Sequence, residues 1–199
     1  MPGSILVVCT GNICRSPMAE GMLRAMLEER LGEAAPLVAS AGTAGWDGRP
    51  ATEEAVAAAA ELGIDIAGHR ARELRAEHIR AADLVIGMTE EHVEAILALA
   101  PTAANRTFTL KELVRLLEAV PAPEVGPSPL ETLRARVRQA DALRRRGGVR
   151  NPFDTGVVDP LGEGLQVYRA VAWELREWCA RLVDALVGEA PSARAAAEG

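Results

Sequence analysis

The sequence has no stretch of uninterrupted apolar residues near the roughly 18 that a membrane-spanning helix requires. No basic residue precedes Arg15, so the positively charged start of a cleavable signal peptide is also missing. With only three cysteines, an odd number, the chain cannot build the disulfide framework of a small secreted protein. Together these absences predict a cytoplasmic protein that does not interact with membranes.

The sequence also lacks an excess of positive charge. Its 28 acidic residues outnumber its 22 basic ones, which gives a formal net charge of −6. Because non-specific nucleic-acid binders carry a dominant basic surface, we expect no nucleic-acid partner. The 199 residues, 49% of them hydrophobic and 25% charged, have the size and balance of one globular domain with a core. Lys111 is the only lysine, which we interpret as a compositional bias.

Short apolar runs alternate with segments of helical periodicity. The expected strands cover 4–8, 37–40, 82–88 and 107–109. A first helix is expected to begin at Pro17, and others are expected over 52–62, 90–99 and 110–119. This alternation predicts a three-layer α/β/α fold of the flavodoxin-like kind, with four parallel strands. Since such sheets bind ligands at the carboxyl ends of their strands, Cys9–Ser16 is expected at the binding edge.

The region after residue 120 departs from this alternation. Residues 121–129 contain four prolines and suggest a linker, and the apolar spacing over 130–145 predicts another helix. The opposite face of that helix is rich in arginine, at Arg134, Arg136, Arg138, Arg144, Arg145 and Arg146. We interpret it as a solvated basic face, with a docking surface for an acidic partner as the alternative. A long amphipathic helix over 168–186 and a disordered tail over 191–199 are expected to complete the chain.

The segment Cys9–Ser16 has the residue types that a phosphoryl-transfer site requires. It lies between a buried strand and a helix start, where backbone amides and the helix N-terminus attract an anion. Gly11 permits tight curvature, and a cysteine at the base of such a loop is expected to exist largely as the thiolate. Arg15 follows Cys9 after five intervening residues and can grip two oxygens of a tetrahedral anion. The pattern predicts a thiolate that attacks a bound phosphate, with a buried structural Cys9 beside an anion-binding loop as the alternative.

The stretch Val8–Glu20 closely resembles the signature loop of bacterial-type low-molecular-weight protein tyrosine phosphatases, close to the protein arginine phosphatase branch. The resemblance continues in Ser40–Thr43 with Trp46, in 63–72, in 82–92 and in Asp159–Pro160. It covers most of 4–110 and 155–188. It implies one phosphatase domain over 1–190 with a four-stranded parallel sheet, into which a helical segment at about 116–150 is inserted.

By position, the resemblance implies a role for each residue of the loop. Cys9 would be the nucleophile that forms a phosphocysteine intermediate, Arg15 the phosphate clamp, and Asp159 the general acid. Ser16 would hydrogen-bond the thiolate, and Asn12 would brace the loop. The other substrate-binding positions implied are Thr10, Gly11, Ile13, Cys14 and Trp46. The ligand expected in the loop is phosphate or another oxyanion on a phosphorylated protein.

Two of these assignments have alternatives. Asp154 precedes Asp159 in the same loop, and an Asp-Pro pair is often only a turn, although the match through Asp159–Pro160 favours Asp159. The resemblance suggests that Cys14 forms a reversible disulfide with Cys9 that protects the nucleophile, unless it is a small packing residue.

The remaining histidines and cysteine are not expected to do chemistry. His69, His78 and His92 are scattered, so structural hydrogen bonding is expected of each, and Cys179 lies on an apolar stripe. The sequence has no CxxC pair and no cluster of histidines, and arginine and amides supply positive charge. We therefore expect neither a metal nor a cofactor.

The substrate is predicted from two positions. Ile13 stands where tyrosine-directed members carry isoleucine and arginine phosphatases carry threonine, and it suits an aromatic leaving group. Leu161–Gly164 lacks the aromatic residues that many tyrosine-directed members place there, and Glu163 is suited to face a guanidinium. We predict hydrolysis of phosphotyrosine on proteins, with protein arginine phosphatase as the alternative. Less favoured hypotheses are a thiol-dependent arsenate reductase, for which only Cys179 remains as a relay, and a non-catalytic phosphoprotein-binding module.

Overall fold

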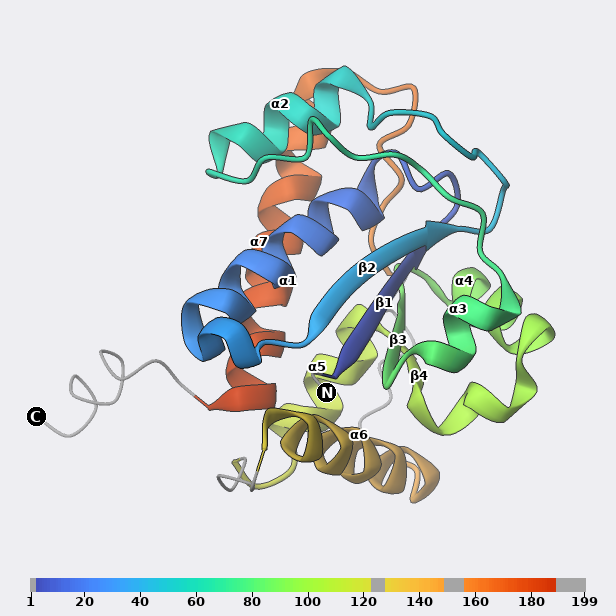
Figure 1. Ribbon diagram of the computed structural model, residues 1–199, viewed down its shortest axis with the longest axis vertical. Coiled ribbons are helices and arrows are strands. Elements are labelled where there is room, and N and C mark those ends of the chain that lie inside the picture. The colour runs from blue at the N-terminus through green and yellow to red at the C-terminus, as the bar shows by residue number, and fades with distance from the viewer. Residues whose placement is uncertain (1–2, 123–127, 149–155, 189–199) are drawn as a thin grey trace, which may run out of the picture.

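Four parallel strands form a central sheet in the computed structural model, which describes residues 3–122, 128–148 and 156–188 (Figure 1). The strands are β1 (Ser4–Cys9), β2 (Leu37–Gly42), β3 (Leu84–Gly87) and β4 (Thr107–Thr109). Their order is β2-β1-β3-β4, so β1 is an inner strand with neighbours on both sides. The predicted α/β fold with a four-stranded parallel sheet is confirmed. The predictions for the tail at 191–199 and for Asp154 lie outside the described residues, as does part of the linker at 121–129.

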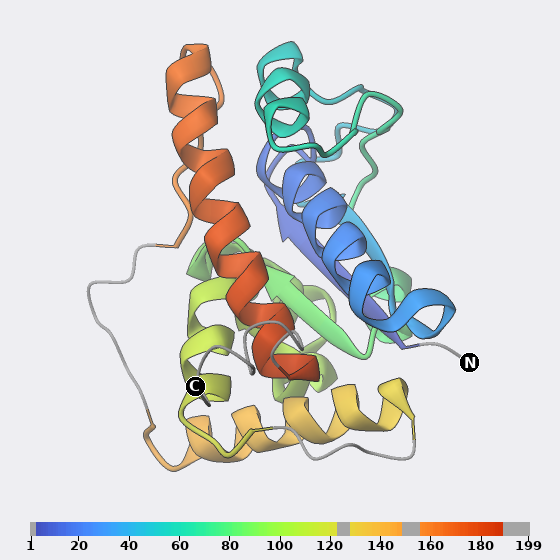
Figure 2. The ribbon, with the colours of Figure 1, turned by 90° about the vertical axis from the view of Figure 1, so that its left-hand side faces the viewer.

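Helices cover both faces of this sheet (Figures 1 and 2). On one side pack α1 (Arg15–Leu31), α2 (Glu53–Glu61), α5 (Leu110–Glu118) and α7 (Leu165–Val187). On the other lie α3 (Ala76–Ala81), α4 (Glu90–Leu99) and the 3-10 helix η2 (Pro101–Arg106), and a second 3-10 turn, η1 (Gly32–Ala34), follows α1. Side chains of β1 alternate between the two cores, because Ile5 and Val7 join the first and Leu6 and Val8 the second. Of the helices described, none is both long and apolar enough to cross a bilayer.

The first helix begins earlier than predicted. It starts at Arg15, after Cys14 as its N-cap, whereas Pro17 was expected to open it. Pro17 is compatible with this start because the first turn of a helix needs no N–H donors from its own residues. The earlier start places Arg15 on the helix and leaves the loop before it shorter. The short helix α3 was not predicted, since only Ile79 of its six residues is buried.

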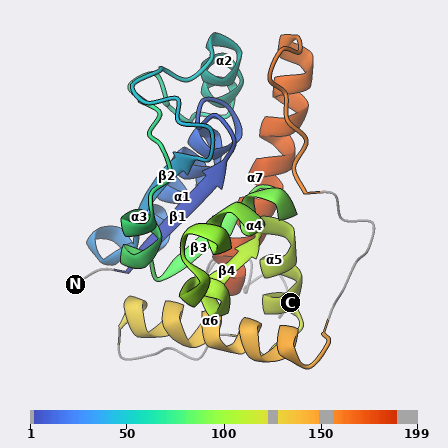
Figure 3. The same cartoon turned by 90° about the vertical axis from the view of Figure 1, so that its right-hand side faces the viewer.

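The helix predicted over 130–145 is present as α6 (Pro129–Arg145) and lies across the amino ends of the strands (Figure 3). It packs on α5, α7 and η2. The interpretation of its arginines as a solvated face is wrong for Arg136 and Arg144. Arg136 is 2% exposed and donates to the carbonyls of Leu117, Pro121 and Ala185. Arg144 donates to the carbonyls of Ala104 and Thr107 and lies 4.0 Å above the ring centre of Phe108.

Candidate active site

Cys9 is the last residue of the inner strand β1 and lies at the carboxyl edge of the sheet. It is paired in register with Gly42 of β2, and its carbonyl accepts a hydrogen bond from Thr43 N at 3.0 Å. Gly42 is required there, because a Cβ on it would lie 2.6 Å from the carbonyl oxygen of Thr10. The contacts of Cys9 with β2 and Thr43 thus fix the start of the loop that follows.

The phosphate-binding loop, defined here as Cys9–Ser16, differs in how its backbone amides and its carbonyls are hydrogen-bonded. The N–H groups of residues 11–14 donate to no acceptor among the described residues. The carbonyls of Thr10, Asn12 and Ile13 accept from Ala44 N at 3.0 Å, His69 Nε2 at 2.7 Å and Thr52 N at 2.9 Å, respectively. Buried donors without acceptors are rare in folded proteins. Together with the N-terminus of α1, these free donors fit a bound oxyanion.

Asn12 holds the loop in this conformation. Its φ of 54° is the left-handed region, which a residue other than glycine adopts at a cost in energy. Its Nδ2 donates to Ser16 Oγ and to Ser40 Oγ, both at 2.8 Å, and its Oδ1 accepts from Arg72 N at 2.9 Å. These three hydrogen bonds offset the strain and fix the loop before any ligand arrives.

Ser16 connects Asn12 to the sulfur of Cys9. Its Oγ lies 2.9 Å from Cys9 Sγ. Because the same oxygen accepts from Asn12 Nδ2, the hydroxyl proton of Ser16 is available for the sulfur. The network therefore fixes the position of the Cys9 sulfur, which is the candidate nucleophile.

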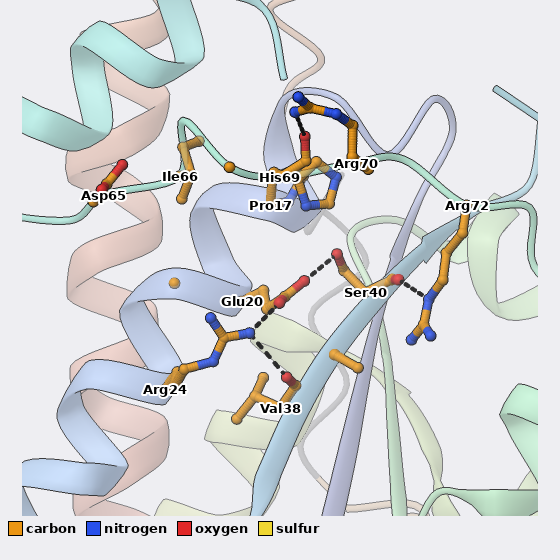
Figure 4. A pocket seen from close by; sticks show the side chains of 13 residues that line it. Pro17, Glu20, Arg24, Val38, Ser40, Asp65, Ile66, His69, Arg70 and Arg72 are labelled. Carbon is orange, nitrogen blue, oxygen red and sulfur yellow. Dashed lines mark hydrogen bonds and ion pairs between the residues drawn. The ribbon is translucent and has the colours of Figure 1, made fainter. Parts of the chain in front are cut away.

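The network continues behind the loop to the wall of a cavity of about 580 Å³ (Figure 4). Ser40 donates to a carboxylate oxygen of Glu20, and Arg24 donates to the other oxygen of that carboxylate and to the carbonyl of Val38. A chain of hydrogen bonds therefore runs from Arg24 through Glu20, Ser40, Asn12 and Ser16 to Cys9. Glu20 and Ser40 belong to the stretches that carry the resemblance, but no role was assigned to them from the sequence.

Arg15 is 4% exposed and faces both the loop and the segment after residue 156. Its Nη1 donates to the carbonyl of Val157 at 3.0 Å, and its Nη2 donates to Asp159 Oδ2 at 2.8 Å and to Thr10 Oγ1 at 3.4 Å. Its buried Nε has no hydrogen-bond partner among the described residues. A guanidinium with one unused donor beside a loop with unused amides is suited to clamp a tetrahedral anion.

His92 is an addition to the residues expected near the site. It is 3% exposed, and its Nδ1 accepts from Thr89 N at 3.0 Å, so the ring proton is on Nε2. Nε2 donates to Thr10 Oγ1 at 2.9 Å. Burial, followed by the charge of Arg15, lowers the pKa of His92 from 6.5 to about 4 and keeps the ring neutral. The sequence signal was the capping pattern of Thr89 followed three residues later by His92.

Ile13 and Trp46 lie together on one side of the loop. A Cβ on Gly11 would lie 3.3 Å from Ile13 Cγ1 and 3.7 Å from Trp46 Cδ2. The guanidinium of Arg49 stacks 5.2 Å from the centre of the Trp46 ring. Two apolar side chains therefore lie beside the loop at Gly11, and the guanidinium of Arg49 stacks on one of them.

All three cysteines are free thiols in the structure. Cys14 Sγ lies 3.4 Å from Tyr168 Oη and 3.7 Å from Thr52 Oγ1, and burial raises the pKa of this thiol. Cys179 is buried in α7, and burial raises the pKa of its thiol to about 12. His78 receives a hydrogen bond from Arg75 N and is not part of the site. The fold thus brings together the loop, Trp46 and Asp159, but neither His78 nor Cys179.

Comparison with known proteins agrees with this geometry. Residues 4–140 match the family model for low molecular weight phosphotyrosine protein phosphatase. The chain is 39% identical over 189 residues to a protein-arginine-phosphatase of Geobacillus stearothermophilus, which covers 95% of this chain and 99% of that protein. It is 43% identical over 105 residues to the low molecular weight protein-tyrosine-phosphatase Etp of Escherichia coli (strain K12), covering 53% of this chain and 67% of Etp.

A solved structure shares the fold over nearly the whole chain. The low molecular weight protein tyrosine phosphatase from T. tengcongensis superposes with a TM-score of 0.67 and 33% identity, covering 92% of this chain and 98% of that one. The matched family model spans the free amides of the loop, Cys9 and Arg15. The chain therefore belongs to the low molecular weight phosphotyrosine protein phosphatase family, and it is a protein phosphatase of the phosphoric monoester hydrolase class.

Proposed function

We propose that this phosphatase hydrolyses phosphotyrosine on proteins through a phosphocysteine intermediate. The observation that carries the choice of substrate is the pair of apolar side chains beside the loop, Ile13 and Trp46, which both approach Gly11. A phenyl ring gains free energy by burying its faces against such side chains. Val158 and Leu161, on either side of Asp159 in sequence, are among the exposed large hydrophobic residues and extend the apolar surface available to a ring.

In the first step, the thiolate of Cys9 attacks phosphorus in line with the bond to the tyrosine oxygen. The amides of residues 11–14 and the Nε and Nη2 donors of Arg15 hold the three phosphoryl oxygens, where negative charge must be stabilised in the transition state. Asp159, protonated, gives its proton to the tyrosine oxygen as that bond breaks. The products are a phosphocysteine and a neutral tyrosine side chain.

In the second step, a water molecule replaces the departed tyrosine. Asp159, now a carboxylate, accepts a proton from this water as its oxygen attacks phosphorus. The bond between phosphorus and the Cys9 sulfur breaks, which releases inorganic phosphate and restores the thiolate. The hydrogen bond from Ser16 stabilises the sulfur anion as it leaves, since Ser16 Oγ lies 2.9 Å from it.

Phosphoarginine is the second candidate substrate. The Geobacillus relative that is a protein-arginine-phosphatase matches this chain over nearly its whole length. The segment Leu161–Gly164 is also rich in glycine and has no aromatic side chain that could stack on a phenyl ring. Against this, the guanidinium of Arg49 stacks on Trp46, one of the two apolar side chains beside the loop, and like charge repels a second guanidinium there. We therefore favour phosphotyrosine.

The deciding experiment measures phosphate release from two peptides of one sequence, one carrying phosphotyrosine and the other phosphoarginine. Cys9→Ser serves as the blank. We expect a kcat/KM at least tenfold higher for phosphotyrosine, and we expect Ile13→Thr to reduce that ratio. A wild-type preference for phosphoarginine would mean that the glycine-rich segment outweighs Ile13. The proposed mechanism would be contradicted if the wild type released no more phosphate than Cys9→Ser from either peptide.

A further inference from the structure

A second hollow of about 950 Å³ lies at the amino ends of the strands, at the opposite edge of the sheet from the phosphate-binding loop. Four arginines line it: Arg80 from α3, Arg106 from η2, and Arg134 and Arg138 from α6. We call it the amino-end groove. Figure 3 shows α6 running beneath the starts of the strands. Four residues of α6 line the groove: Leu130, Arg134, Val137 and Arg138.

Two of these arginines are held by the protein. Arg134 donates to Asp83 Oδ1 at 2.8 Å, and Arg106 donates to the carbonyl of Ala82 at 3.0 Å. Asp83 is the single acidic residue of the lining, and its other oxygen accepts from Ser4 N at 2.9 Å. Both carboxylate oxygens of Asp83 therefore already accept hydrogen bonds, and the guanidinium groups of Arg134 and Arg106 are held in place.

The other two arginines are available to a ligand. Arg80 and Arg138 are exposed and have neither an ion-pair nor a hydrogen-bond partner in the described part of the chain. The groove as a whole carries four positive charges against one negative charge. In a protein of net charge −6, this local excess of positive charge attracts anionic groups to one place.

The groove also has apolar lining. Leu37, the first residue of β2, is 66% exposed and contributes to it, together with Leu130 and Val137 of α6. An exposed leucine between arginines offers little to a simple polyanion. It does match a ligand that carries an apolar side chain between its negative charges.

We propose that the amino-end groove binds an acidic segment of a partner protein that contains leucine or a similar apolar residue. Its carboxylates pair with Arg80 and Arg138, and its apolar side chain packs on Leu37. A nucleic acid fits less well, because it has no aliphatic side chain for Leu37 and the remainder of this acidic protein repels its phosphates.

The position of the groove gives the proposal a functional consequence. The six residues of β1 separate the two edges of the sheet by about 20 Å. A partner can thus occupy the groove while a phosphorylated residue lies in the loop. Binding at the groove raises the effective concentration of the partner's phosphorylated residue near the loop. It therefore lowers KM for that partner without changing kcat.

Fluorescence anisotropy with a labelled synthetic peptide tests the binding directly and does not depend on phosphatase activity. The probe has the sequence Glu-Glu-Leu-Glu-Glu-Leu-Glu, and its twin carries glutamine in place of each glutamate. We expect the acidic peptide to bind the wild-type protein with an affinity that falls as salt is added. The double variant Arg80→Glu/Arg138→Glu should bind at least about tenfold more weakly, and Leu37→Ser should weaken binding independently.

The matched control is Arg146→Glu/Arg176→Glu, which changes the charge equally at two exposed arginines outside the groove. It should bind the acidic peptide within about twofold of the wild type. Thermal unfolding checks that both double variants are folded. The proposal is overturned if the wild type does not bind the acidic peptide, if the glutamine twin binds equally, or if both double variants lose affinity equally. If a single-stranded oligonucleotide bound the wild type more tightly than the acidic peptide, and Arg80→Glu/Arg138→Glu lost that binding, the partner would be a nucleic acid and the proposal would be overturned.

Discussion

Arg15 and Asp159 form an ion pair in the unliganded protein, with Nη2 and Oδ2 2.8 Å apart. The proposed phosphate clamp therefore holds the proposed general acid before substrate binds. An incoming phosphate competes with the Asp159 carboxylate for the same donor, because both are anions that accept from Nη2. We expect substrate binding to displace the Asp159 carboxylate from Arg15, which leaves it free to take up a proton from solvent and then to donate that proton to the leaving group.

Replacing Asp159 should separate these two functions. Asp159→Asn removes the proton donor, so kcat for a phosphotyrosine peptide should fall about 100-fold or more. The same change removes the anion that competes for Arg15, so inorganic phosphate should inhibit the variant more strongly than the wild type. Steady-state kinetics with phosphate as inhibitor measures both effects. Asp154→Asn is the control, and a larger loss in that variant would transfer the acid role to Asp154.

Removing the Ser16 hydroxyl should weaken the nucleophile. Ser16→Ala deletes the hydrogen bond to the Cys9 sulfur, and bonds to charged groups contribute about 1.5–3 kcal/mol. This range corresponds to a fall in kcat/KM of about 10–100-fold. Ser40→Ala, one step further from the sulfur, should reduce kcat/KM less. Equal losses in the two variants would show that Ser16 acts only by supporting Asn12.

His92 should make folding stability depend on pH. Its pKa is about 4 in the folded protein against an ordinary 6.5. Between these values the unfolded chain takes up a proton that the folded protein does not. The stability associated with His92 is therefore complete above about pH 6.5 and falls as the pH drops toward 4, by up to about 3 kcal/mol.

Urea unfolding at pH 7.0 and pH 4.5 measures this dependence. The free energy of unfolding should decrease more between these conditions in the wild type than in His92→Gln, which cannot take up the proton. The comparison between the two pH values separates titration from any direct loss of the hydrogen bond to Thr10. An equal decrease in both proteins would contradict the role of His92.

Arg136 and Arg138 should differ greatly in their effect on stability although they lie two residues apart on α6. Arg136→Met leaves the carbonyls of Leu117, Pro121 and Ala185 without the donor they have now, so we expect a loss of about 3 kcal/mol or more. Arg138→Met changes an exposed side chain without a partner in the described residues, and its effect should stay within about 0.5 kcal/mol. Thermal or urea unfolding of the two variants gives the comparison. Similar values would mean that α6 contributes little to the folded core.

The elements that were predicted best are those with sharp local signals. The strand Thr107–Thr109 and the helix Glu90–Leu99 have the predicted bounds, because Pro101 ends the helix region and a short β-branched run follows. The start of α1 was displaced because Ser16 and Pro17 have the composition of a helix start, whereas Cys14 caps the helix with its backbone alone. The buried position of Arg136 was missed, since sequence gives the charge of a side chain but not the carbonyls that surround it.

In the site, too, features with a local sequence signal were predicted, and contacts between residues distant in sequence were not. The local pattern from Cys9 to Arg15 was enough to predict an anion-binding loop, because strand, loop and helix are consecutive. Asp159 lies 144 residues from Arg15, and only family resemblance brought the two together before the structure did. The contact of His92 with Thr10 spans 82 residues and had no sequence signal beyond the helix cap.

The location of Cys9 on an inner strand has a consequence for how the enzyme loses activity. Amide hydrogens on β1 are bonded to β2 on one side and to β3 on the other, so their exchange with solvent requires the sheet itself to open. Cys9, the proposed nucleophile, is the last residue of this inner strand. Inactivation by heat or urea should therefore coincide with global unfolding, whereas an active site on a peripheral loop is lost earlier by local fluctuations.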